Sequence, residues 1–243
     1  MPKPVQDHLE MLPYAAITLT DGHLKRMRDT VKADLLRIPN DDLLKGFRIR
    51  AGLPAPGKDL GGWYTSDTFH IFGQLLSALA RFAAADHDAA CRGKLDALIR
   101  GWAATIRPDG YFFYTDKPNT YHYTYEKMVG GLVDAIVFTK SFSAKRHLAT
   151  ITDWAEKHLD RTRPYGADAA EWYTLSENLF RAADATGDDR YRRFAQVWEY
   201  TRYWDAFAAN QNIHTLAPSY HAYSHVNTLC GAAMAYNSSG DKH

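Results

Sequence analysis

The densest group of reactive side chains lies in residues 221–227, which read HAYSHVN. Its histidines, His221 and His225, are spaced so that both lie on one face of a helix, as metal ligands do. The segment lacks the glutamate of an HExxH zinc motif, and no third ligand is close in sequence. Three interpretations remain open: a metal pair, hydrogen bonds from His221, His225 and Asn227 to a substrate, or histidines satisfied inside a core.

A second candidate site combines two carboxylates with aromatic rings. Residues 171–178 read EWYTLSEN and place two glutamates beside a tryptophan and a tyrosine. Glycosidases use a pair of carboxylates, and aromatic rings pack on sugars. In a continuous helix a spacing of six places Glu171 and Glu177 on different faces, so the pair would need a loop between them. Glu177 remains a candidate substrate-binding residue.

The segment YTYEK, residues 123–127, comes directly before an apolar helical stretch. At a helix N-terminus Glu126 complements the helix dipole, while Lys127 neutralises Glu126. Alternatively, both side chains face a pocket, and Glu126 and Lys127 are then substrate-binding candidates. The sequence leaves these two interpretations open.

Residues 61–67, GGWYTSD, precede a further helical stretch. Ser66 or Asp67 suits the N-cap of that helix. His70 follows Asp67 by three residues, which places both on one helix face where they can form a hydrogen bond. Trp63 is either a core anchor or a platform for a sugar ring. Trp63 and His70 are therefore further substrate-binding candidates.

The composition excludes several other kinds of protein. The chain has 243 residues, of which 46% are hydrophobic, enough to bury a substantial core in one domain or two small ones. With 29 Lys and Arg against 28 Asp and Glu, the net charge of +1 gives no general attraction to nucleic acid or to an anionic membrane. No nucleotide-binding glycine loop and no GxSxG elbow is present, so nucleotide-dependent and serine-hydrolase chemistry have no support.

No apolar run has the length of a membrane span, and the first residues lack the apolar core of a signal peptide. We therefore expect a soluble protein without a membrane partner, and its compartment and oligomeric state stay open. Cys91 and Cys230 are far apart and form neither a CxxC metal motif nor a disulfide framework. We expect both to be small buried hydrophobes and predict no metal ligand.

Helical hairpins are expected to position these side chains. From about residue 69 an apolar helical stretch, a short polar break and a second amphipathic helix recur with a period of roughly 50 residues. The predicted hairpins span residues 73–102, 131–159 and 176–198, and the first helix of a fourth covers residues 226–236. Such hairpins pack as a solenoid or a closed ring, or they form an irregular bundle.

Other segments surround these hairpins. Residues 111–115 and 121–125, both rich in tyrosine, are expected to be short strands or loops. Residues 24–36 carry helical spacing, and residues 52–57, GLPAPG, predict a loop.

The predicted hairpins are too few to close a ring, since six of them need on the order of 300 residues. The last residues, GDKH, fall inside a predicted hairpin turn. We therefore expect an all-α protein that forms an incomplete (α/α)6 barrel over residues 41–243. A connector and one helix precede it in residues 1–40, and the chain is expected to be truncated at its C-terminus.

Seven short motifs follow one another along the chain: FR at 47–48, AGLP at 51–54, GGW at 61–63, LSALA at 76–80, DGY at 109–111, YEKMVGGL at 125–132 and HAYSHVN at 221–227. Together they resemble glycoside hydrolase family 127, the β-L-arabinofuranosidase-like enzymes. The resemblance extends from about residue 41 to the C-terminus. It implies an (α/α)6 barrel and hydrolysis of a terminal furanoside or related glycoside, so an oligosaccharide or glycoside is the expected partner.

The resemblance also implies a cysteine nucleophile that is held on zinc by further cysteines and a glutamate, together with a glutamate acid/base. In the family these residues lie beyond the HAYSHVN segment, and Cys91 and Cys230 match none of them. We therefore assign no catalytic residue and no zinc ligand in this chain, and we expect it to be inactive alone. Gly131 stands where the family has the histidine of a Gly-His-Leu triplet, which weakens the prediction of arabinofuranose specificity.

Two alternatives to a hydrolase fragment remain. The first is a complete, non-catalytic helical module that binds a saccharide or a protein on a concave face. The second is a full enzyme that uses Glu171 and Glu177 as its carboxylate pair.

Overall fold

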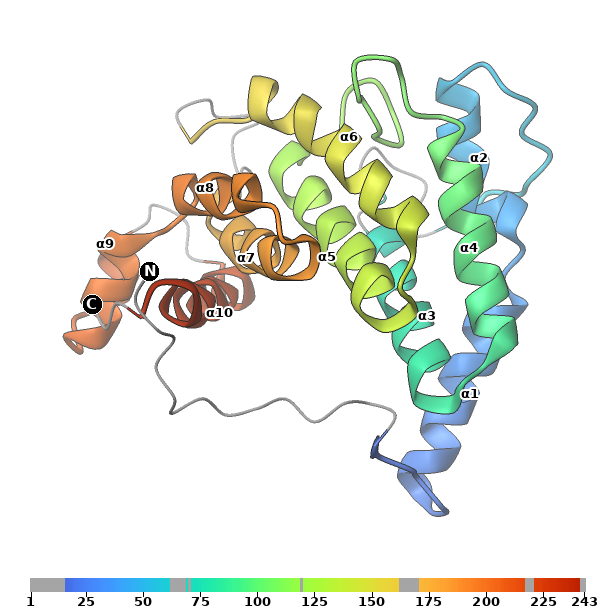
Figure 1. Cartoon of the computed structure of the whole chain (residues 1–243), viewed down its shortest axis with the longest axis horizontal. Coiled ribbons are helices and arrows are strands. Elements are labelled where there is room, and N and C mark those ends of the chain that lie inside the picture. The colour runs from blue at the N-terminus through green and yellow to red at the C-terminus, as the bar shows by residue number, and fades with distance from the viewer. Residues whose placement is uncertain are drawn as a thin grey trace. The chain divides into compact units, whose positions relative to one another are not determined.

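The computed structural model describes residues 16–61, 69, 71–118, 120–161, 171–216 and 221–240. Within these residues the regular secondary structure is helical, and no strand occurs (Figure 1). The predicted all-α fold class is therefore confirmed. Internal contacts divide the chain into two compact units.

The N-terminal unit takes its described residues from 11–119 and 127–158, and the C-terminal unit takes them from 120–126 and 159–243. Helix α5, Tyr121–Thr139, contributes its first residues to the C-terminal unit and the remainder to the N-terminal unit. The domain boundary at residue 40 stays a prediction.

The first predicted hairpin consists of α3, Ile71–Asp86, and α4, Ala89–Ala103. His87 between them has a left-handed φ of 51°. Asp88 caps α4, because its Oδ1 accepts hydrogen bonds from two amides of the first turn at 2.9 Å each. The break predicted in this hairpin is thus formed by a reversal of the backbone and an N-cap.

The second predicted hairpin consists of α5 and α6, Phe142–His158. In the connection Lys140 has a left-handed φ of 56°. Within the N-terminal unit α3 and α5 approach each other backbone to backbone. A Cβ added to Gly73 would lie 2.1 Å from the carbonyl oxygen of Lys127, so only glycine fits at this contact.

The prediction of a strand or loop for residues 121–125 is wrong, because these residues open α5. The Thr124 amide donates to the carbonyl oxygen of Thr120 at 3.0 Å and closes the first turn. Tyr123 and Tyr125 are buried, so packing as a helix outweighs the β propensity of a tyrosine-rich stretch. Residues 111–115 form neither helix nor strand, in agreement with the loop alternative.

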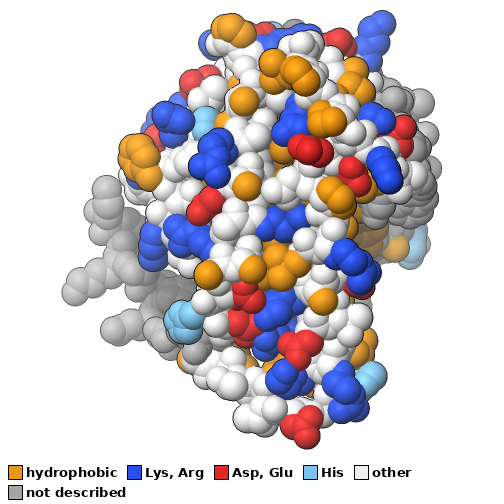
Figure 2. All heavy atoms as spheres, turned by 90° about the vertical axis from the view of Figure 1, so that its right-hand side faces the viewer, with side chains coloured by type: hydrophobic (Ala, Val, Ile, Leu, Met, Phe, Trp, Pro, Cys, Tyr) orange, Lys and Arg blue, Asp and Glu red, His pale blue; other side chains and the backbone are white. Residues whose placement is uncertain are grey.

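Helices α1, His23–Arg37, and α2, Asn40–Arg50, complete the N-terminal unit. The predictions of a helix at 24–36 and of a loop at 52–57 are confirmed. Helix α1 packs on α3 and α4, and Lys32 pairs with Asp86 at 2.9 Å. Figure 2 shows basic and acidic side chains interspersed over the face that carries α1, α2 and α4, as expected for a balanced net charge.

The C-terminal unit contains α7, Leu175–Thr186, α8, Asp189–Val197, α9, Thr201–Ala208, and α10, Ala222–Ser239, with 3₁₀ turns at Trp172–Thr174 and Ile213–Thr215. Helices α7 and α8 form the third predicted hairpin, and α10 is the predicted first helix of the fourth. Helix α9 was not predicted.

Close packing of α7 on α10 sets the framework of this unit. A Cβ added to Gly231 on α10 would lie 2.0 Å from the Ser176 hydroxyl on α7.

Among the helices of the described residues, none is long and apolar enough to span a bilayer.

Candidate functional site

Glu126 is a buried carboxylate near the start of α5, with 2% of its surface exposed. Its Oε1 accepts a hydrogen bond from Nδ2 of Asn178 on α7. Asn178 is also buried, and its Oδ1 accepts a hydrogen bond from Nη1 of Arg181 at 2.6 Å. A buried carboxylate is tolerated only where polar groups replace its hydration water. Asn178 therefore fixes Glu126 and links it to a cation on α7.

A second carboxylate, Glu171, bonds to the predicted site residue His221. Oε1 of Glu171 and Nδ1 of His221 are 2.7 Å apart. The side chain of Glu171 is 13% exposed and that of His221 is 53% exposed, so the pair reaches solvent through the imidazole. Glu171 has a left-handed φ of 34°, which residues with a Cβ rarely adopt. The fold thus maintains an unfavourable backbone conformation at the residue that holds His221.

Ser224 also contacts His221. Its Oγ lies 3.1 Å from Nδ1 of His221 and 3.0 Å from the hydroxyl of Tyr173. In a Ser–His–acid triad the serine and the acid use different nitrogens of the imidazole. Here Glu171 and Ser224 meet the same nitrogen, which carries at most one proton. The arrangement therefore orients His221 and does not create a serine nucleophile.

Two tyrosines connect the surroundings of Glu126 and Glu171. The hydroxyl groups of Tyr123 on α5 and Tyr223 on α10 are hydrogen-bonded to each other. Burial raises the pKa of Tyr123 to about 12, and the Glu126 and Glu171 carboxylates add to that rise. Both carboxylates thus lie within electrostatic range of one hydroxyl. We call Tyr123, Glu126, Glu171, His221 and Tyr223 the tyrosine–carboxylate cluster.

The exposed edge of this cluster consists of two rings from α10 and its N-cap. Tyr223 is 49% exposed, and its ring packs edge-on against His221 at a centroid distance of 4.6 Å. Imidazole and phenol groups can both donate and accept hydrogen bonds, and their faces are apolar. This edge therefore offers polar tips and flat surfaces to a ligand from solvent.

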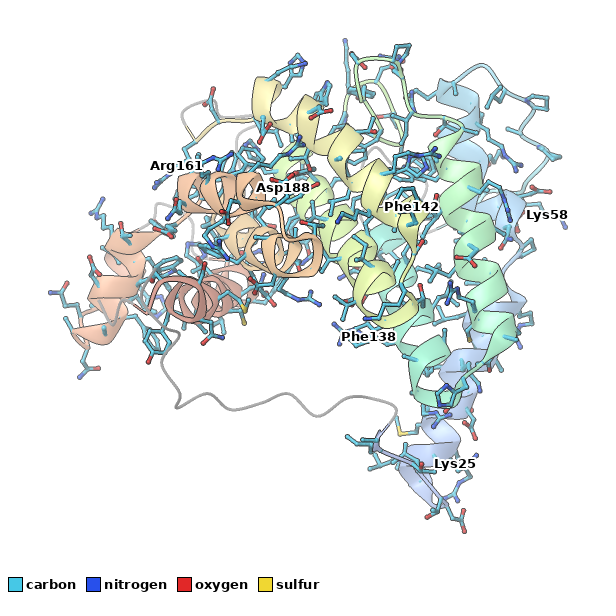
Figure 3. All side chains as sticks on the ribbon, in the orientation of Figure 1. Lys25, Lys58, Phe138, Phe142, Arg161 and Asp188 are labelled. Carbon is cyan, nitrogen blue, oxygen red and sulfur yellow. The ribbon has the colours of Figure 1, made fainter. Side chains whose placement is uncertain are left out.

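An aromatic layer supports the cluster. The rings of Tyr173 and Tyr200 stack at 5.6 Å, and Trp172 lies 4.9 Å from Tyr200. The guanidinium of Arg161, which is labelled in Figure 3, lies 4.1 Å from the centre of the Trp172 ring. Burial raises the pKa of Tyr173 to about 12, so this phenol stays protonated. Rigid aromatic packing thus limits the freedom of the Glu171 segment.

His225 has the surroundings of a satisfied core histidine. It is 2% exposed, and its Nδ1 donates to the carbonyl oxygen of His221 at 2.9 Å. The rings of Tyr173 and Tyr203 lie 4.5 Å and 5.5 Å from its imidazole. Of the two histidines on α10 and its N-cap, only His221 presents a substantially exposed imidazole.

The other predicted site residues stand outside this cluster. Lys127 belongs to the N-terminal unit, where its carbonyl group packs against Gly73. Glu177 is half-buried on α7, and its carboxylate helps to raise the pKa of Cys230 on α10. Asn227 is half-buried on α10. Two further candidates, Trp63 and His70, lie outside the described residues.

Sequence reasoning missed the residues that connect the cluster. The partner of Glu171 is His221, fifty positions later in the chain, whereas the sequence paired Glu171 with Glu177. Tyr123 was noticed only as part of a tyrosine-rich segment. A helical assignment of residues 121–125 would have placed Tyr123 and Glu126 on one face through their spacing of three. No sequence signal identified Asn178 as the partner of Glu126.

The described residues do not fit the zinc site that the resemblance implies. They contain no group of three or more His, Cys, Asp or Glu side chains that could hold a metal ion. Zinc binds thiolates, yet burial raises the pKa of the Cys91 thiol to about 11. Cys91 is buried as predicted, whereas Cys230 is exposed, so the prediction of a buried residue is wrong for Cys230. Desolvation and the Glu177 carboxylate nevertheless raise the pKa of Cys230. We therefore derive no chemical step through zinc.

Comparison with known proteins specifies the family of this all-helical protein built from hairpins. Residues 16–243 match the family model described as β-L-arabinofuranosidase, GH127 catalytic domain. The chain therefore belongs to glycoside hydrolase family 127, and the predicted family is confirmed.

A solved structure shows the same fold. The chain is similar to a GH127 β-L-arabinofuranosidase from Geobacillus stearothermophilus T6, with 16% sequence identity and a TM-score of 0.62. The match covers 93% of this chain and 42% of that protein, so the chain spans less than half the length of the solved structure. No curated protein matches the sequence. The helical-hairpin construction expected of an α/α-barrel protein is thus supported by an independent structure.

Proposed function

We propose that this chain supplies a glycoside-binding site of a family 127 hydrolase and that the tyrosine–carboxylate cluster is this site. Family membership supports a glycoside as the substrate class. The observation that carries the proposal is the Glu171–His221 pair, in which a mostly buried carboxylate holds an imidazole that is 53% exposed. A sugar hydroxyl that approaches this pair finds acceptors on the carboxylate and the imidazole, and the neighbouring Tyr223 phenol can donate as well as accept.

The cluster suits a sugar because it combines fixed polar groups with flat apolar ones. Sugar hydroxyls need partners at defined positions, and their C–H faces pack on aromatic rings. The hydrogen bond between His221 and Glu171 uses Nδ1 of the imidazole and does not involve the second ring nitrogen, Nε2. Tyr223 adds a phenol beside this imidazole. Polar groups that are already oriented bind with a smaller entropy loss than flexible ones.

Binding and bond cleavage are assigned to different residues in this proposal. Glu126 is held by Asn178, and Glu171 is held by His221. These contacts suit residues that position a ligand. The described residues do not provide a thiolate–zinc centre, so we propose that the reacting groups of the family's mechanism lie outside them. The chain alone is then expected to bind a glycoside without hydrolysing it.

A terminal L-arabinofuranoside is the substrate to test first, since the similar solved protein is named as a β-L-arabinofuranosidase. The experiment is a calorimetric and saturation-transfer NMR titration of the chain with methyl β-L-arabinofuranoside. Methyl β-D-glucopyranoside serves as the comparison for furanoside specificity. We expect saturable binding of the furanoside and, with H221A, a loss of affinity of about tenfold, the cost of one hydrogen bond to a polar site.

A matched control comes from the same unit. Phe207 on α9 is 52% exposed and is not part of the cluster, so F207A should bind as the unsubstituted chain does. The proposal fails if the furanoside does not bind, or if H221A and F207A bind it equally well. Circular dichroism of each variant confirms that the helices are intact.

A further inference from the structure

A cavity of about 550 Å³ lies in the N-terminal unit between α4 and the start of α6. This volume lies within the range of small-molecule sites. Helix α4 supplies Asp96 and Arg100, and α6 supplies Arg146 and His147. Phe142, the first residue of α6, is labelled in Figure 3 and lies on the side of α6 that faces α4 in this view. The cavity is separate from the tyrosine–carboxylate cluster, all of whose residues belong to the C-terminal unit.

Positive charge at this cavity is not neutralised within the described part of the chain. Neither Arg100 nor Arg146 forms an ion pair there, and Nη2 of Arg146 makes only a 3.5 Å contact with Nε2 of His147. The single carboxylate of the lining, Asp96, already pairs with Arg92 at 3.1 Å. Guanidinium groups without a carboxylate partner are well suited to bind oxyanions through paired N–H donors.

The first turn of α6 adds further donors. Ser141 and Ser143 line the cavity, and the Ser141 hydroxyl accepts a hydrogen bond from the Ala144 amide at 3.2 Å. The first amides of a helix have no partner within the helix, and the positive end of its dipole favours an anion. Ser143 is a half-buried residue.

His147 links this cavity to the core. Its ring packs edge-on against Trp102 at 6.2 Å. Burial lowers the pKa of His147, and the neighbouring Arg146 lowers it further. An anion in the cavity would oppose the second of these effects, so His147 is a built-in reporter of occupancy.

We propose that the cavity between α4 and α6 is an oxyanion-binding site that takes a phosphate or carboxylate group through Arg100, Arg146, His147 and Ser143. The same chemistry has two sources: a free inorganic anion, or the acidic group of a charged saccharide. The proposal does not depend on glycoside binding at the tyrosine–carboxylate cluster.

The test is an NMR titration of the full chain, labelled with ¹³C and ¹⁵N, at low ionic strength. Sodium phosphate and galacturonate are added separately, and galactose serves as the uncharged match of galacturonate. We expect a saturable shift of the His147 ring signals and a rise in the pKa of His147. Saturation by phosphate alone identifies a free anion as the ligand, and saturation by galacturonate but not galactose identifies an acidic saccharide.

Variants that each remove one positive charge distinguish a specific anion site from general electrostatic attraction of the anion. R100Q and R146Q should each weaken binding about fivefold or more, and the double variant should abolish it, because each removes a charge-assisted hydrogen bond. Lys157 in the last turn of α6 is exposed and does not line the cavity, so K157Q removes the same charge as a control. The proposal is overturned if neither anion saturates in the millimolar range, or if K157Q weakens binding as much as R146Q.

Discussion

Helix α5 carries two buried carboxylates, and the fold stabilises them differently. Asp134, in the N-terminal unit, is 1% exposed, and its Oδ2 receives a hydrogen bond from the Ser77 hydroxyl and pairs with Nε of Arg81 at 2.8 Å. Glu126, in the C-terminal unit, accepts from the neutral amide of Asn178, and the cation Arg181 acts on that amide.

Asp134 is thus part of a structural ion pair, whereas Glu126 is positioned by a neutral amide. A carboxylate paired directly with a guanidinium is neutralised where it is buried, and breaking such a pair is costly. A carboxylate held through an amide keeps more of its charge available to its surroundings. The Glu126 carboxylate contributes, after burial, to the rise in the pKa of Tyr123. The candidate site lies beside Glu126, the carboxylate that accepts from the amide of Asn178.

The largest expected effect on stability is at the ion pair between Arg81 and Asp134. Arg81→Met should lower the free energy of unfolding by about 3 kcal/mol, because it leaves the Asp134 carboxylate buried without its cation. Urea denaturation measures this loss. Arg92→Met is the matched control, since the Arg92–Asp96 pair is exposed and such pairs contribute about 0–1 kcal/mol. Equal losses in the two variants would show that Asp134 is not stabilised by Arg81.

A smaller effect is expected at Glu126. Asn178→Ala removes the hydrogen bonds of Asn178 with Glu126 and with Arg181 and should cost about 2 kcal/mol in the same denaturation experiment. Asn237→Ala, at an exposed position of α10, should cost little. If Asn178→Ala costs more than Arg81→Met, the ranking of the direct and indirect arrangements is reversed.

A buried histidine of α5, His122, makes the stability of the C-terminal unit depend on pH. His122 is buried, and its Nε2 donates to the carbonyl oxygen of Asp160 at 3.0 Å. Burial lowers the pKa of His122 in the folded state below 6.5, the ordinary value of a histidine. The unfolded chain then binds more protons, so the stabilisation is present above pH 6.5 and is lost as the pH falls through the lowered folded pKa.

We expect the loss from His122 to be at most about 1.4 kcal/mol per pH unit, the value for one proton. Denaturation of the unsubstituted chain and of His122→Gln between pH 7.5 and 5 measures it. The variant should lose less stability than the unsubstituted chain over this interval. Parallel pH profiles would show that His122 is not held neutral by the fold.

Local signals in the sequence were sufficient for most helices. The apolar periodicity and the polar breaks located the α3–α4, α5–α6 and α7–α8 hairpins, because such hairpins are specified by contacts close in sequence. Residues 121–125 were misassigned because tyrosine favours strands locally, whereas the burial of Tyr123 and Tyr125 in a helix depends on distant neighbours.

The site was predictable only in part. The HAYSHVN segment identified His221, and the YTYEK segment identified Glu126, since both are dense in polar and aromatic side chains. The pairing of His221 with Glu171 and of Glu126 with Asn178 joins residues about fifty positions apart. Spacing rules apply within one helix and give no information on such pairs.

The sequence by itself determined that this is an all-α protein of helical hairpins and that its motifs are those of glycoside hydrolase family 127, because helix periodicity and short motifs are local properties. Only the tertiary structure decided which of its polar residues meet. It separated the exposed His221 from the buried His225 and brought Glu126 and Glu171 within range of Tyr123. Packing between helices sets these distances, and no local pattern encodes them.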